Sequence, residues 1–487
     1  MNRRRFIHAA GATGLGLTSR FGFGATERAS AVLLNLLEDS PRERIPRELV
    51  RMIRAGLRYE DLLSALVLAA VRNVQPYPDV GFKYHSVMML RSIHLTTQHM
   101  SSSDKWLPIA WATDYFKETQ AQERDTDGWR LPTRAATPVG SVQAARQALI
   151  VALDKWDRDA ADAAIVNYAQ AARPEEIFSL LFPYGARDLR AIGHKAITVS
   201  NAHYLIELLG SAQAEPILRS TVAALQNHDA DPNPATQDLG PDQSWRHNLK
   251  WLPEIPENWK QGRNDAGARA ELHAALYRVS EQESGAVVIE LLRQGISPDT
   301  IWQVLFDTAA ELLMHQPGIV PLHAQTTANA LYYAYRVCRD QRTQQLTLLQ
   351  CAAFIALFRK LVGAKQPDPS LEALQPLALE GSVVDAIGEV FADVAAGRRL
   401  QAARKSLGYL QSGGDAEALI AKARHHLVYN ADEVHDYKFS EAVFDSYAHL
   451  SNSAWQCRFL SAGMAYFKAP AERPGPLVEQ MLQRLRA

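Results

Sequence analysis

Four histidines occupy similar places along this chain, each close to the start of an apolar segment with helical periodicity. They are His85, His194, His323 and His435. The first two lie 109 residues apart and the last two 112 residues apart (194 − 85 = 109 and 435 − 323 = 112). Neutral imidazole is a ligand for iron, zinc, copper, nickel and manganese. If the fold brings the four rings together, they predict a transition-metal site.

A single histidine at a helix start is more commonly a polar end group or a buried structural residue than a ligand. The metal-site interpretation therefore depends on the matched pairs, and the surrounding sequence contains a matching repeat. "RAGLRYEDLLSALVLAAV" (54–71) and "RQGISPDTIWQVLFDTAA" (293–310) both begin Arg-x-Gly-aliphatic and then align apolar positions at a common offset of 239. Such self-similarity indicates two copies of one helical unit. We predict two halves related by a pseudo-twofold axis, with the histidines between them.

The elements that must position these residues are predicted to be helices. Residues 47–74, 141–172 and 267–295 carry apolar residues at steps of three and four, and no alternating β-branched series occurs. An all-α fold follows. Residues 117–140 are polar and predict a long loop.

The predicted halves are residues 32–227 and 267–487, joined by residues 228–266. The joining segment contains three tryptophans among prolines, asparagines and aspartates. A flexible linker would contain fewer aromatic residues, so this segment predicts an ordered crossover that lines a site.

The N-terminus is typical of a twin-arginine export signal. "NRRRFIHAAGATGLGLTSRFGFGATERASA" begins with paired arginines and continues into a weakly apolar stretch. Residues 1–31 are expected to form this signal, and a disordered basic tail is the alternative. The chain of 487 residues has a net charge of −1, which does not favour nucleic-acid binding. No apolar run is long enough for a transmembrane helix, so no integral membrane segment is expected in the mature chain.

Several catalytic classes have no motif in this chain. There is no GxSxG, HExxH, P-loop or strand-preceded GxGxxG sequence, so a flavin or nicotinamide cofactor is not expected. Carboxylates near the proposed ligands, with Glu207 and Glu441 foremost, could orient an imidazole but are expected to be exposed. Lys195 and Lys438 are expected on the surface, while Tyr84 or Lys438 is a candidate for proton transfer.

Four short segments together resemble the questin oxidase-like family. They are "KYHSVMML", "GHKAI", "LHAQTTANAL" and "VHDYK". The strongest match is a Leu-His-Ala-x-Thr element followed by Asn-Ala-Leu, which here comprises His323, Thr326, Asn329, Ala330 and Leu331. The resemblance spans roughly residues 45–465 and implies a largely helical enzyme of the kind that oxidatively opens anthraquinone rings in a Baeyer–Villiger-like step. The export signal and the tryptophan-rich crossover depart from that pattern.

These observations predict an exported, metal-dependent oxygenase or oxidoreductase. Its substrate is expected to be a small aromatic or carbonyl-containing molecule that binds between the two halves. Iron is the first expectation for the metal, with zinc, copper or manganese as alternatives. The expected partners are this substrate and the twin-arginine export machinery, and the expected location is the periplasm or the medium. A non-catalytic helical scaffold, a bis-histidine haem protein and a hydrolytic metal enzyme remain alternatives.

Overall fold

The computed structural model describes residues 23–77, 80–126, 128–137, 140–228, 233–364, 370–379, 383–450, 453–469 and 475–486. The expected all-α fold is confirmed, because the described residues contain helices, turns and one isolated bridge between Arg263 and Ile296 but no strand. No helix in this part of the chain combines the length and apolarity needed to span a membrane. The paired arginines of the predicted export signal lie outside the described residues. Helix α1 (Phe23–Asp39) extends across the predicted end of the signal.

The first half of the chain forms helices α1 to α11. After α1 these are α2 (Ile45–Arg54), α3 (Tyr59–Asn73), α4 (His85–Met88), α5 (Leu90–Gln98), α6 (Trp106–Thr126), α7 (Val142–Asp154), α8 (Arg158–Ala171), α9 (Pro174–Ala186), α10 (His194–Leu209) and α11 (Ala214–Leu225). Short 3₁₀ turns precede four of them, namely η2 (Arg42–Arg44), η3 (Phe82–Tyr84), η4 (Arg190–Gly193) and η5 (Ser211–Gln213). Gly56 separates α2 from α3, and its φ of 92° lies in the left-handed region that glycine favours at the end of a helix.

The second half of the chain forms helices α12 to α23. These are α12 (Gly240–Trp251), α13 (Ala266–Leu276), α14 (Ser284–Arg293), α15 (Pro298–His315), α16 (Ile319–Val337), α17 (Gln341–Leu361), α18 (Val383–Ala395), α19 (Arg399–Gln411), α20 (Ala416–Asn430), α21 (Val434–His449), α22 (Ser453–Met464) and α23 (Pro476–Arg486). Local signals set several starts. Ser297 caps α15 ahead of Pro298, and the Asp340 side chain caps α17.

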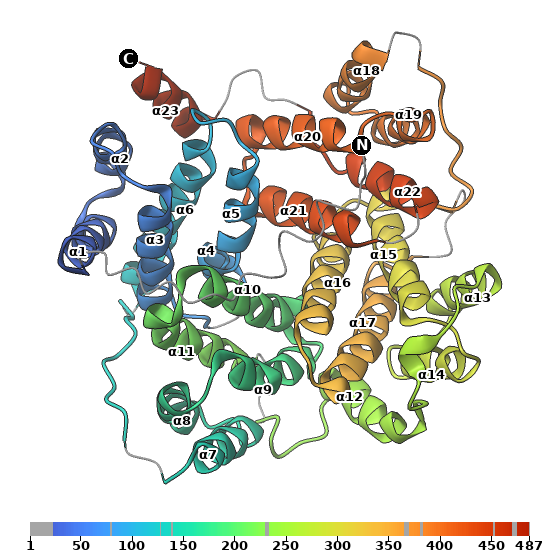
Figure 1. The fold of residues 1–487 in the computed structure, drawn as a ribbon, viewed down its shortest axis with the longest axis horizontal. Coiled ribbons are helices and arrows are strands. Elements are labelled where there is room, and N and C mark those ends of the chain that lie inside the picture. Colours follow the sequence, from blue (N-terminus) through green and yellow to red (C-terminus); the bar gives the residue numbers. More distant parts are fainter. Residues whose placement is uncertain are drawn as a thin grey trace.

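Helices from both halves meet in the middle of the molecule, where α5, α10, α16 and α21 lie together (Figure 1). Helix α16 packs against both α10 and α21, and α5 packs against α10 and α21 in turn. One apolar core runs through this arrangement. The helices expected to correspond by duplication thus converge on the centre, although the duplication itself stays a prediction.

Two predictions about irregular segments need correction. The loop predicted for 117–140 is wrong over residues 117–126, which belong to α6. Four of its polar side chains are buried, namely Lys117, Thr119, Gln120 and Glu123. Lys117 Nζ, for example, donates to the main-chain oxygen of Leu37 at 2.7 Å. The crossover at 228–266 is ordered where it is described and contains α12. It does not line the cavity at the four histidines, and Trp245 instead lines a separate cavity beside α9 and α17.

Candidate metal centre

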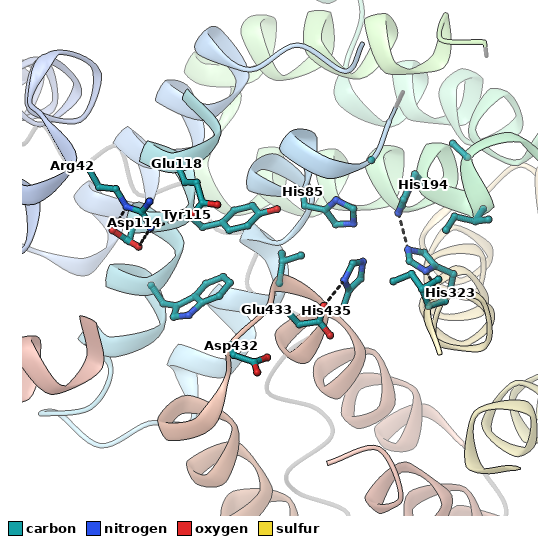
Figure 2. A pocket seen from close by; sticks show the side chains of 16 residues that line it. Arg42, His85, Asp114, Tyr115, Glu118, His194, His323, Asp432, Glu433 and His435 are labelled. Carbon is teal, nitrogen blue, oxygen red and sulfur yellow. Dashed lines mark hydrogen bonds and ion pairs between the residues drawn. The ribbon is translucent and has the colours of Figure 1, made fainter. Parts of the chain in front are cut away.

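The four predicted histidines converge on one point at the centre of the helices. One ring nitrogen from each of His85, His194, His323 and His435 lies within 4.8 Å of the others, and Figure 2 shows the imidazoles facing one another. All four side chains are buried, and His323 is inaccessible to solvent. We call these residues the histidine cage.

The order of the rings around the cage agrees with the predicted symmetry. Adjacent ring centroids are separated by 4.9 Å for His85 and His194, 4.6 Å for His194 and His323, 5.1 Å for His323 and His435, and 4.6 Å for His435 and His85. His85 therefore lies opposite His323, and His194 lies opposite His435. A twofold axis relating the two halves requires this order.

Each histidine lies near the N-terminus of its helix. His85 and His194 are the first residues of α4 and α10, His435 is the second residue of α21, and His323 lies in the second turn of α16. The partial positive charge at helix N-termini disfavours protonated imidazole and favours a bound anion or a neutral ligand. The local sequence therefore places the rings where they tend to stay neutral, which is the form that binds a metal.

Polar contacts orient two of the rings towards the centre. His323 Nδ1 lies 2.6 Å from the main-chain oxygen of Ile319 and must donate to it, so Nε2 presents a lone pair. That Nε2 lies 2.7 Å from His194 Nε2. His435 Nδ1 lies 3.5 Å from a carboxylate oxygen of Glu433, which leaves its Nε2 for the centre. With metal–nitrogen bonds of 2.0–2.1 Å, adjacent ligands at right angles would be about 2.9 Å apart and opposite ones about 4.1 Å apart. The cage thus needs only small shifts to hold a transition metal.

A strained turn sets the position of His194. The three residues before it, Ala191, Ile192 and Gly193, have φ values of 52°, 45° and 86°. Left-handed conformation is unfavourable for the first two, and such strain persists only where surrounding contacts enforce it. Asp188 provides these contacts: it accepts 3.0 Å from the main-chain nitrogen of Arg190 and 2.9 Å from Lys195 Nζ, on either side of the turn.

Burial controls the protonation of the cage. Desolvation lowers the pKa of His194 and of His323 well below the ordinary value, and the positive charge of Lys438 and the neighbouring histidines lower both further. Desolvation also lowers the pKa of His435, although Glu433 opposes this shift. Conversely, the neighbouring His435 lowers the pKa of Glu433 to about 2. Near neutral pH His194, His323 and His435 therefore offer uncharged imidazoles.

This protonation state predicts a loss of stability in acid. Below about pH 6.5 the unfolded chain protonates His194 and His323, whereas the folded protein keeps them neutral, so stability is full above that pH and falls as the pH decreases. Each of the two contributes about 1.4 kcal/mol per pH unit. We expect urea unfolding of the protein in chelator to show this slope. The double variant His194→Gln, His323→Gln should show a shallower dependence of stability on pH. An unchanged dependence would contradict the conclusion that these two histidines are neutral in the folded protein.

The cage opens into a cavity of about 620 Å³, which we call the large cavity. Its walls are partly aromatic: Trp111 and Tyr115, one turn apart on α6, stack with centroids 5.6 Å apart and planes inclined by 8°. Charged residues also line it, namely Arg42, Asp114, Glu118, Asp432 and Glu433. Arg42 forms ion pairs with Asp114 at 2.6 Å and with Glu118 at 3.0 Å. These ion pairs join the 3₁₀ turn η2 to α6 beside the cavity (Figure 2).

Most of the other candidate residues differ from expectation. Glu441 is buried, not exposed, and pairs with Arg424. Glu207 is exposed, as expected, and does not line the large cavity. Lys195 and Lys438 were expected on the surface but are both buried, because Lys195 pairs with Asp188 while Lys438 lies between the central helices. The Tyr84 hydroxyl lies 2.8 Å from Ser220 Oγ and does not line the large cavity.

The sequence reasoning missed Arg42, Trp111, Tyr115 and Glu433. Trp111 and Tyr115 could have been recognised as a pair in the sequence, because residues four apart on a helix share a face. Glu433 could also have been recognised, since it precedes His435 by two residues at a helix start and forms a capping box with Asp436. Arg42 could not have been recognised from the sequence, because its contact with α6 joins residues that are 72 positions apart. Comparison of the chain with family models, curated proteins and solved structures finds no match.

Proposed function

We propose that this protein is an exported metal-dependent oxidoreductase that uses molecular oxygen to oxidise a small aromatic or carbonyl-containing molecule. The observation that carries this proposal is that four buried histidines line a cavity large enough for such a molecule. Structural metal sites are closed by protein ligands, whereas catalytic sites leave a position open to substrate. The second kind is supported by the large cavity, onto which the histidine cage opens.

The residues of the cage fit a transition metal. An all-imidazole set suits iron, copper, zinc or nickel and does not suit magnesium or calcium, which prefer oxygen ligands. When bound, the metal would supply a Lewis acid or a redox centre. Iron is our first choice because the chain resembles oxygen-using enzymes.

The chain's own residues would bind and orient the substrate. The stacked rings of Trp111 and Tyr115 offer a flat apolar face to an aromatic molecule. Ile192, Ile319 and Val434 line the same cavity and would exclude water from the reacting atoms. The reaction class that we propose is ring-opening dioxygenation, in which both atoms of one O₂ are added to the substrate as its ring opens. This reaction balances without an external reductant.

The alternatives have less support. A helical scaffold predicts that the four histidines lie far apart, and they do not. A haem held by two opposite imidazoles would occupy the plane in which the other two imidazoles lie. A hydrolytic metal enzyme uses the same kind of cage, so activity measurements must distinguish it.

Elemental analysis of the protein purified from the periplasmic fraction tests the metal site. We expect close to one metal ion per chain, and its loss in the His323→Ala, His435→Ala pair. His203→Ala is the control, because His203 lies on α10, the helix of His194, but bonds to Tyr333 at 2.8 Å outside the cage. A folded native protein without metal would overturn the proposal.

Oxygen uptake then tests the reaction. We expect uptake by the metal-loaded protein in the presence of hydroxylated aromatic ketones, with one O₂ consumed for each substrate molecule and no added reductant. Metal without oxygen uptake, but with cleavage of aryl esters, would favour the hydrolytic alternative.

A further inference from the structure

The crossover segment lines a cavity of its own. Trp245 and Leu249, both on α12, line a space of about 860 Å³ that we call the crossover cavity. Its other walls come from α7, α8 and α9 and from α17 with the residues that precede it, and none of its lining residues also lines the large cavity. Figure 1 shows α7, α8, α9 and α12 along the lower edge of the molecule, below the central helices. A volume of this size suits a small organic molecule.

Three carboxylates line the crossover cavity, and each is already bonded within the protein. The Tyr184 hydroxyl donates to Asp154 at 2.6 Å. Glu176 and Asp340 accept from main-chain nitrogens at the starts of α9 and α17, at 3.0 and 2.7 Å. Carboxylates in such positions satisfy donors that the first turn of a helix leaves without partners. The three negative charges therefore have fixed roles in the fold.

Three arginines line the same cavity, and the carboxylates compensate them poorly. Arg146 and Arg342 form no ion pair with any carboxylate in the described part of the chain. Arg187 lies 3.7 Å from Asp154, and its side chain is 13% exposed. The Nε of Arg187 has no hydrogen-bond partner among the described residues. Because a guanidinium carries five N–H donors and keeps its charge, the donors of this cavity favour an anion.

The rest of the wall suits an aromatic ring with a hydroxyl group. Tyr184 and Trp245 are half-buried and line the cavity, so they offer aromatic surface to a ligand. Pro183 lies inside α9 and has no N–H to donate to the main-chain oxygen of Ser179. Both Pro183 and Ser179 line the cavity, so this oxygen is an acceptor for a ligand hydroxyl.

We propose that the crossover cavity binds small hydroxylated aromatic carboxylates. The carboxylate of the ligand accepts hydrogen bonds from Arg146 and Arg342, which as charge-assisted bonds are stronger than bonds between neutral groups. The ring packs against Trp245 and Tyr184, and its hydroxyl donates to the main-chain oxygen of Ser179. No metal takes part, so this site depends neither on the histidine cage nor on the proposed function.

Calorimetric titration with 4-hydroxybenzoate tests the proposal, and 4-hydroxybenzamide serves as a neutral ligand of the same shape. We expect the protein to bind 4-hydroxybenzoate and to bind the amide about 10- to 100-fold more weakly, the usual loss when a hydrogen bond to a charged group is removed. The double variant His323→Ala, His435→Ala should bind 4-hydroxybenzoate as well as the unaltered protein. Absence of binding, or equal affinity for the amide, would overturn the proposal. Loss of binding in the double variant would place the ligand at the cage and would overturn it as well.

Substitutions that each remove one positive charge locate the bound carboxylate. Arg146→Gln and Arg342→Gln should each lower the affinity for 4-hydroxybenzoate about tenfold and leave the affinity for the amide unchanged. Arg339→Gln is the matched control, because Arg339 is exposed, precedes Arg342 by three residues and does not line the cavity. An equal effect of Arg339→Gln would show attraction by the general surface charge, and the assignment to this cavity would fail.

Fluorescence gives a readout that does not depend on the arginine variants. A ligand packed against Trp245 should quench part of the tryptophan emission. Trp245→Phe keeps an aromatic wall, so it should retain binding but lose that part of the quenching. Trp251→Phe is the control, because Trp251 lies on the same helix but does not line the cavity. If quenching by 4-hydroxybenzoate were the same in Trp245→Phe as in the unaltered protein, the ligand would bind elsewhere and the proposal would be wrong.

Discussion

Replacing Gly193 with alanine is expected to lower the free energy of unfolding by about 2–5 kcal/mol and to displace His194 from the cage. The backbone φ of 86° costs an alanine about 1–2 kcal/mol. A Cβ at this position would also lie 2.0 Å from Thr327 Oγ1 and 2.7 Å from Thr327 Cγ2, and overpacking of this kind costs about 1–3 kcal/mol. Urea unfolding and metal titration of the same variant would measure the two effects.

Two further variants separate the causes of this loss. Gly56 has a similar φ of 92°, but beyond its chain neighbours no atom lies within 4 Å of the place that an added Cβ would take, so Gly56→Ala should show only the backbone cost. Thr327→Ala should relieve most of the clash, and the Gly193→Ala, Thr327→Ala pair should therefore be more stable than the sum of the single effects predicts. Strict additivity would show that contact with Thr327 does not position the strained turn.

Arg424→Met is expected to destabilise the protein by about 3–5 kcal/mol, because it leaves the buried Glu441 carboxylate without its counter-ion. Both Arg424 Nε and Nη2 donate to Glu441 at 2.9 Å, and Thr96 Oγ1 donates at 2.9 Å. These bonds join α20, α21 and α5, so the helices that carry His435 and follow His85 depend on them. Denaturant unfolding measures the loss, and we expect weaker metal binding alongside it.

Controls for this prediction come from an exposed pair and from a double replacement. Arg51 bonds to Glu48 at 2.9 Å on the surface of α2, so Arg51→Met should change stability by less than about 1 kcal/mol. Replacing Arg424 with Met and Glu441 with Leu together should recover much of the loss, since no charge is then buried alone. If the double variant were as unstable as Arg424→Met, packing rather than charge would explain the effect.

The parts of the cage that could be predicted are those with local signals. A histidine near a helix start is visible in the sequence, and equal spacing in two halves pairs His85 with His323 and His194 with His435. The apolar periodicity that predicts α3 and α15 is likewise local. These signals sufficed to choose four histidines out of 15 and to predict that they meet.

The parts that could not be predicted depend on contacts between distant segments. Lys195 and Lys438 were expected on the surface because lysine is rarely buried, and only the packing of neighbouring helices encloses them. The strained turn before His194 could not be predicted either, because Ala191 and Ile192 are residue types that occur commonly in helices. Asp188, whose contacts with Arg190 and Lys195 enclose the turn, has no distinguishing context in the sequence.

The two oriented rings of the cage differ in how they would respond to sequence drift. The acceptor for His323 is the main-chain oxygen of Ile319, which every amino acid supplies, so substitution at that position leaves the ring's tautomer unchanged. The partner of His435 is the side chain of Glu433, which a single codon change removes. Relatives of this protein can therefore change the residue at the position of Ile319 without changing the tautomer of His323, but should retain an acidic or amide side chain at that of Glu433. Mutational tolerance would then be unequal across the two halves of a symmetric site.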